Sequence, residues 1–227
     1  MITRFYRPTL HAATVLFALA LPAMAQDAID PANFSSTINN PWLPLTPGTV
    51  LTYQGTKDAR PATLLVTVTD RSKDIAGVTC RVVEELVSLA GAPIDRTIAY
   101  YAQDLAGNVW YFGEDVQELD TTGAVVNTEG WKTGIDGAIP SLVMEATPTQ
   151  GHTLVNAYTN DHSEVINLAR AVNTPAGTYP DALETKEWTP DEPDMLVNKY
   201  YVQGIGLVRD VAVLGDPEEF LLVAVTK

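Results

Sequence analysis

YYAQDLAGNVWYFGED, residues 100–115, carries the strongest structural signal in the chain. Two runs rich in β-branched and aromatic residues, 97–103 and 109–112, flank the loop sequence 104–108. Because glycine and asparagine tolerate positive φ angles, this pattern predicts a β-hairpin with a short loop. A hairpin with so many aromatic rings forms either the centre of a β-core or the wall of a ligand cavity.

Apolar and polar residues alternate with period two along most of the chain, which is typical of strands. About a dozen strand candidates follow one another through turns of Asp, Gly, Asn and Pro. Residues 71–74 predict one of these turns, and residues 139–144 predict a short helix. Strands joined by short turns favour antiparallel neighbours. The predicted fold class is therefore all-β, a strongly curved antiparallel sheet (half-barrel or barrel), with a β-sandwich as the alternative.

The first 25 residues predict a cleaved signal peptide. Arg4 and Arg7 precede the apolar run 12–21, and the small-x-small sequence Ala23-Met24-Ala25 follows it, so Gln26 is the expected first mature residue. The apolar run has about half of the roughly 20 residues that span a bilayer. The predicted localisation is periplasmic or secreted, with no membrane span.

Removal of 25 of the 227 residues leaves 202, enough for a single β-rich domain, residues 26–227. Its one cysteine, Cys80, cannot form an intramolecular disulfide and is expected to be a small buried apolar residue. Loss of Arg4 and Arg7 takes the formal charge from −14 to −16. This acidity argues against nucleic acid and anionic lipid as partners. The oligomeric state stays open.

The chain resembles a family of exported bacterial proteins of unassigned function. The resemblance rests on four elements that follow one another through the mature chain: Asn40-Pro41-Trp42-Leu43-Pro44-Leu45 with Pro47-Gly48-Thr49, the hairpin 103–115, Lys186-Glu187-Trp188-Thr189-Pro190, and Lys199-Tyr200-Tyr201 with Gly204-Ile205-Gly206-Leu207-Val208. It implies secretion and a β-rich fold, and no activity. The last element is also similar to exported β-half-barrels that hold lipids or other apolar ligands.

The first candidate site is the aromatic hairpin. Glu114 continues the strand face of Trp110 if no bulge intervenes, which would set a carboxylate beside an aromatic wall. Burial there would raise the pKa of the carboxyl group and suit it to acid–base chemistry. The alternative is a solvated strand end.

The second candidate site combines Lys186, Glu187 and Trp188 with Lys199, Tyr200 and Tyr201. If residues 190–194 form a hairpin loop, the strands on either side are antiparallel neighbours and bring these side chains together. An ordinary cross-strand ion pair is the alternative to a cavity-facing cluster. We expect this region and the aromatic hairpin to border one shared cavity, so Trp110, Glu114, Glu187, Trp188, Lys199 and Tyr201 are the predicted ligand-binding residues.

Other chemistry finds little support in the sequence. His152, Asp161, His162 and Glu164 are types that bind metals, but their spacing matches no established signature, so no metal site is predicted. Nucleophile elbows, phosphate loops and dinucleotide motifs are absent, and no cofactor is expected.

Two function classes stay open. The first is an exported protein that binds a small apolar or amphipathic ligand in a β-sheet cavity. The second is an exported lyase or hydrolase that uses carboxylate and Lys/Tyr groups in the same cavity. The lack of a recognisable catalytic motif favours binding, and the acidic and aromatic residues of one hairpin favour an enzyme.

Overall fold

The computed structural model describes residues 29–156 and 158–227, and its regular structure is almost entirely β-strand, which confirms the predicted all-β class. The predicted signal peptide, residues 1–25, and the cleavage site before Gln26 lie outside the described residues. A three-residue 3-10 helix, Pro31–Asn33, precedes the strands. The strands are β1 (Phe34–Ser35), β2 (Val50–Lys57), β3 (Arg60–Ile75), β4 (Val78–Leu89), β5 (Ala92–Asp104), β6 (Val109–Leu119), β7 (Val125–Lys132), β8 (Ser141–Met144), β9 (Thr153–Val155), β10 (His162–Thr174), β11 (Gly177–Trp188), β12 (Leu196–Val202), β13 (Gly206–Leu214) and β14 (Glu218–Thr226).

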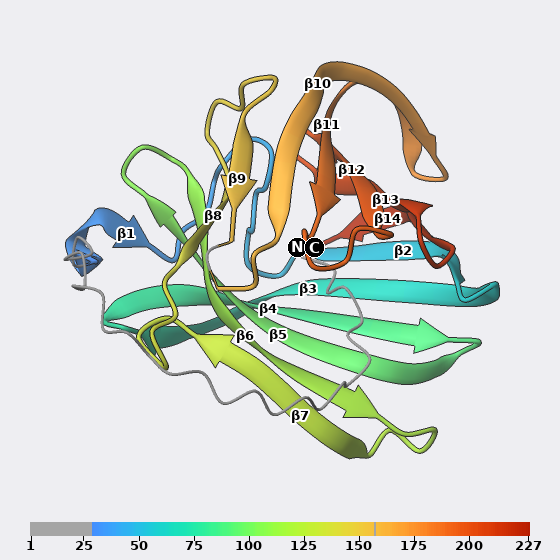
Figure 1. The fold of residues 1–227 in the computed structure, drawn as a ribbon, viewed down its shortest axis with the longest axis horizontal. Coiled ribbons are helices and arrows are strands. Elements are labelled where there is room, and N and C mark those ends of the chain that lie inside the picture. Colours follow the sequence, from blue (N-terminus) through green and yellow to red (C-terminus); the bar gives the residue numbers. More distant parts are fainter. Residues whose placement is uncertain (1–28, 157) are drawn as a thin grey trace.

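One antiparallel sheet of 14 strands is built from two meanders (Figure 1). In the first, β2 to β7 are neighbours in chain order; in the second, β9 to β14 are. The meanders join where β14 pairs with β2, with Thr226 opposite Val50. In the strand order β7 and β9 stand at opposite ends, so the curved sheet is an open half-barrel and not a closed barrel. β1 and β8 are added at β5 and β6.

Two local predictions were wrong. β3 continues to Ile75 through a register shift between Val68 and Ser72, and the chain turns at Ala76 and Gly77, which have φ angles of 50° and 83°. Two successive positive φ angles match the twist of a tight hairpin better than the polar run 71–74 does. The expected helix 139–144 is instead strand β8, because this short apolar run pairs its backbone with β6.

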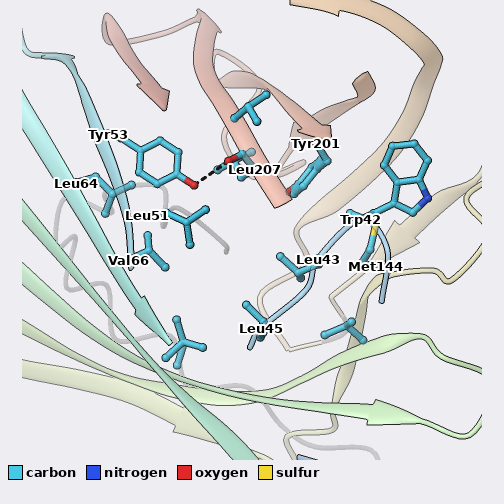
Figure 2. Close-up of a cluster of buried hydrophobic side chains, with 14 of the residues drawn as sticks. Trp42, Leu43, Leu45, Leu51, Tyr53, Leu64, Val66, Met144, Tyr201 and Leu207 are labelled. Atoms are coloured by element: carbon cyan, nitrogen blue, oxygen red, sulfur yellow. Dashed lines mark hydrogen bonds between the residues drawn. The ribbon is translucent and has the colours of Figure 1, made fainter. Parts of the chain in front are cut away.

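The inner face of the sheet is covered by residues 38–45, which we call the lead-in segment. Trp42, Leu43 and Leu45 are buried in one cluster with core residues of the sheet such as Leu51 (Figure 2). Asn40 fixes the segment: its Oδ1 accepts hydrogen bonds from the backbone N–H groups of Trp42 and Leu43, and its Nδ2 donates to two backbone carbonyls. The core therefore depends on a segment that has almost no β-strand structure of its own.

A second, smaller apolar cluster lies on the outer face of β4 to β6. Its buried members are Ile75, Val78, Cys80, Val82, Tyr100, Ala102 and Phe112, with Phe34 and Trp110 packed against them. Cys80 is fully buried, as expected, and burial raises the pKa of its thiol to about 12. A thiol that stays protonated in an apolar cluster is structural and not a nucleophile.

Candidate functional site

A β-bulge in β6 decides which way the aromatic hairpin presents its side chains. Tyr101 is opposite Tyr111, whereas Tyr100 is opposite Gly113, so Phe112 is an extra residue without a partner in the register. Gly113 has a φ angle of 134°, and a Cβ atom there would lie 2.2 Å from the carbonyl oxygen of the neighbouring strand. Only glycine fits this position without displacement of the neighbouring strand.

The bulge separates Trp110 from Glu114. Trp110 lies on the outer face, edge-on to Phe34 with ring centroids 6.1 Å apart, and its Nε1 donates to Asp104 Oδ2 at 2.8 Å. Glu114 lies on the inner face, where its Oε2 accepts a hydrogen bond of 2.9 Å from the Tyr111 hydroxyl. The condition that would have put both side chains on one face, an unbroken strand, is not met. Trp110 and Glu114 do not form a common wall.

Lys199 of β12 lies inside the half-barrel. It is 1% exposed, and its Nζ is 2.5 Å from Glu187 Oε2 on β11. Asp210 of β13 is directly opposite Lys199 and is equally buried. Burial alone would lower the pKa of Lys199, but Glu187 and Asp210 outweigh this effect and raise it above its ordinary value. The ammonium group is therefore charged within the core and held by carboxylates.

Trp188 points away from this cluster. His162 is opposite Trp188 in the register, and the two rings stack on the outer face of β10 and β11 with centroids 5.1 Å apart. Lys186 Nζ lies 4.7 Å from the centre of the Trp188 ring and 2.7 Å from Glu164 Oε2. Successive strand residues face opposite sides, so Glu187 faces inward and Trp188 outward.

Four buried tyrosines surround the inner carboxylates, and burial raises the pKa of each phenol well above its ordinary value. Tyr53 donates to the carbonyl of Leu207 at 2.8 Å, and Tyr111 donates to Glu114. The hydroxyl of Tyr101 is buried without a hydrogen-bond partner among the described residues. An unpaired buried hydroxyl is costly and calls for an explanation.

Glu85 of β4 is the functional candidate that the sequence reasoning missed. It is 8% exposed and lies opposite Val66 on the inner face. Burial raises the pKa of its carboxyl group to about 7; Glu114 and Asp95 add to this increase and Lys199 opposes it. The signal was present in the sequence, since period two places Glu85 on the apolar face of Val83 and Val87.

A small cavity lies between the lead-in segment and the inner face of the sheet. Its volume of about 20 Å³ is room for roughly one water molecule. Most of its wall is apolar, and Glu85 and the tyrosines supply the polar groups. The lining residues are Leu43, Pro44, Leu45, Leu51, Tyr53, Val66, Val83, Glu85, Tyr101, Ile205, Gly206 and Leu207.

The predicted site residues thus divide into two groups. Glu114, Glu187, Lys199 and Tyr201 all face the interior, but none of the six predicted residues is among those that line the cavity. The four interior residues lie close to it: the pKa of the Tyr101 phenol, raised first by burial, is raised further by Glu85, Glu114, Tyr201 and Glu187. Trp110 and Trp188 lie outside, on separate parts of the outer face. The interior arrangement can hold a charged or hydrogen-bonding group and exchange a proton near neutral pH.

The two histidines of the described residues make their contacts outside this interior cluster. His152 Nδ1 lies 3.0 Å from Glu145 Oε1, and His162 stacks on Trp188. Within residues 29–156 and 158–227 no three His, Cys, Asp or Glu side chains come together as a metal site. The same residues contain no helix with the length and apolarity needed to cross a membrane.

The chain matches no protein-family model and no curated protein sequence. Two solved structures are distantly similar. One is an inferred exported protein with a YmcC-like fold from Bacteroides fragilis NCTC 9343, 13% identical over 82% of this chain and 99% of that one, with a TM-score of 0.48. The other is an inferred lipoprotein from Parabacteroides distasonis ATCC 8503, 11% identical over 81% and 97%, with a TM-score of 0.43. At this distance neither carries an argument about what the chain does.

Proposed function

We propose that the protein is exported to the periplasm or secreted, and that it binds a small amphipathic ligand between the lead-in segment and the inner face of its sheet. The signal-peptide pattern of residues 1–25 and the resemblance to exported bacterial proteins of unassigned function support export. The observation that carries binding is the cavity, where apolar walls meet two buried polar groups, Glu85 and the unpaired Tyr101 hydroxyl.

A ligand larger than a water molecule requires the lead-in segment to move. The segment is attached to the rest of the molecule mainly around Asn40: its side chain donates to the carbonyls of Gly107 and Glu145, its backbone N–H donates to Gln103, and Gly204 donates to the carbonyl of the neighbouring Pro41. Leu43 lies beyond these points, has no place in the strand ladder, and donates its N–H within the segment, to Asn40 Oδ1. Displacing Leu43 therefore breaks few backbone hydrogen bonds and exposes apolar surface that a ligand tail can cover.

The first test is native mass spectrometry of protein purified gently from its own compartment, where we expect a retained small molecule. The second is isothermal titration with octanol, octanoate and octylamine, of which at least one should bind. Val66→Ile adds a methylene group beside the cavity and should weaken binding, because the added volume matches the free space. Val225→Ile is the matched control, since Val225 is 44% exposed. Equal binding by both variants would move the site away from this cavity.

A second candidate function is an exported lyase or hydrolase that uses the same interior groups. Glu85 favours it, because a carboxyl group with a pKa of about 7 is suited to general acid–base catalysis at neutral pH. A panel of ester, glycoside and uronate substrates would test this function. Turnover of one of them that is lost in Glu85→Gln and retained in Glu84→Gln would support catalysis over simple binding.

A further inference from the structure

We infer that the polar end of the ligand is a primary ammonium group, held in the cavity by the carboxylate of Glu85 and the hydroxyl oxygen of Tyr101. This inference rests on the proposed function and adds the chemical class of the ligand to it. Three observations lead to it: the charge balance of the interior, the size of the cavity, and the unpaired hydroxyl.

Carboxylates outnumber cations on the inner face. Lys199 is the one buried Lys or Arg side chain of the described residues, and both Glu187 and Asp210 interact with it. Glu85, Glu114 and Asp210 are buried on the same face. A carboxylate or phosphate ligand would add to this excess of negative charge at low dielectric, whereas an ammonium group would reduce it.

The size and hydrogen-bonding capacity of the cavity fit the same group. A primary ammonium group is about as large as a water molecule, and the cavity holds roughly one water. Its three N–H donors need acceptors, which the Glu85 carboxylate and the Tyr101 hydroxyl oxygen offer. Leu43 and Leu51 then provide apolar contacts for the attached methylene chain.

Binding of a cation beside Glu85 has a consequence that binding of a neutral ligand lacks. The groups that act on Glu85 are Lys199, Glu114 and Asp95, together with the surrounding phenols. The phenols and Lys199 keep their protons near neutral pH, whereas the Glu85 carboxyl group, with its pKa raised to about 7 by burial, is partly ionised there. An ammonium ligand favours its ionised form, and at pH 7 about half a proton should leave for each ligand bound.

The experiment is isothermal titration of the full mature protein with octylamine, octanol and octanoate at pH 7, each in phosphate and in Tris. We expect octylamine to bind most tightly and to release protons, seen as a difference in heat between the two buffers. Glu85→Gln should weaken octylamine binding more than about tenfold, because the acceptor loses its negative charge, and should leave octanol unchanged. Tyr101→Phe should weaken it several-fold without loss of folding, since its hydroxyl bonds no other described group.

Glu84→Gln is the matched control for Glu85→Gln, because Glu84 is the adjacent residue on the outer face and pairs with Arg71. Tighter binding of octanol or octanoate than of octylamine would overturn the ammonium inference and leave the proposed function standing. Octylamine binding without proton release would also overturn the ammonium inference and leave the proposed function standing, and this result is measured on the wild-type protein alone. If none of the three probes binds and no molecule is retained in native spectra, the proposed function itself fails.

Discussion

Glu85 should make the protein less stable as the pH rises through neutrality. Burial raises the pKa of its carboxyl group from 4.5 to about 7, so the native state holds this proton more tightly than the unfolded chain does. Its stabilising contribution is complete below pH 4.5 and is lost as the pH rises through about 7. Since one pKa unit corresponds to about 1.4 kcal/mol, the stability lost between pH 5 and pH 8 is about 2 to 3 kcal/mol.

The effect can be isolated by substitution. Glutamine keeps the size and hydrogen-bonding capacity of Glu85 but cannot ionise, so Glu85→Gln should remove this slope. Urea unfolding at pH 5, 6, 7 and 8 measures the free energy of unfolding of the wild type, Glu85→Gln and the outer-face control Glu84→Gln. Relative to wild type, Glu85→Gln should gain about 2 to 3 kcal/mol between the first and last pH, while Glu84→Gln should follow the wild type.

The carboxyl groups with lowered pKa values do not interfere with this measurement. Hydrogen bonds to Asp104 and Asp115 outweigh the opposing effect of burial and hold their pKa values below the ordinary 3.8, so the stability that these groups contribute is lost only in stronger acid. Parallel pH profiles of the wild type and Glu85→Gln over pH 5 to 8 would refute the reasoning. They would mean that water reaches Glu85 in the folded state and that the interior cluster is not dry.

Three further substitutions test the bulge, the outer cluster and the interior ion pair by urea unfolding. Gly113→Ala should lower the free energy of unfolding by about 3 kcal/mol or more, because its Cβ would meet a backbone carbonyl. Gly137→Ala also places a side chain at positive φ but in open space, and should lower it by about 1 kcal/mol. Equal losses would contradict the role of the bulge. Trp110→Ala should cost about 2 kcal/mol, less than the 3–5 of a fully buried ring, because this side chain is only half-buried. Lys199→Met should cost about 3 kcal/mol or more by leaving Glu187 without its partner, and a neutral result would show that the carboxylates are protonated.

The sequence contained most of the strand arrangement. Period-two patterning and turn residues predicted about a dozen antiparallel strands in succession, because half-buried antiparallel strands must alternate apolar and polar side chains. The burial of Trp42, Leu43 and Leu45 was also predictable from their composition. The run Ser141–Met144 was not, since a four-residue run with three apolar residues suits a short helix or strand equally until β6 offers a partner edge.

For the candidate site, the sequence determined the residue types and the tertiary structure decided their grouping. The motifs singled out Glu114, Glu187, Lys199 and Tyr201, which do face one interior. They also singled out Trp110 and Trp188, which do not. The extra residue Phe112 reverses the side on which every later residue of β6 lies, and this reversal depends on the pairing register with β5, which local sequence does not encode.

Glu85 is a second case in which the local sequence determined the residue type but not its environment. Its alternation with Val83 and Val87 placed it on an apolar face, but a charged residue in such a position is usually solvated at a strand edge. Only the closure of the second meander and the lead-in segment over β4 removes water from Glu85 and brings Lys199, from 114 positions further along the chain, within electrostatic reach. Burial and long-range electrostatics are properties of the assembled sheet, and they determine the chemistry of this interior.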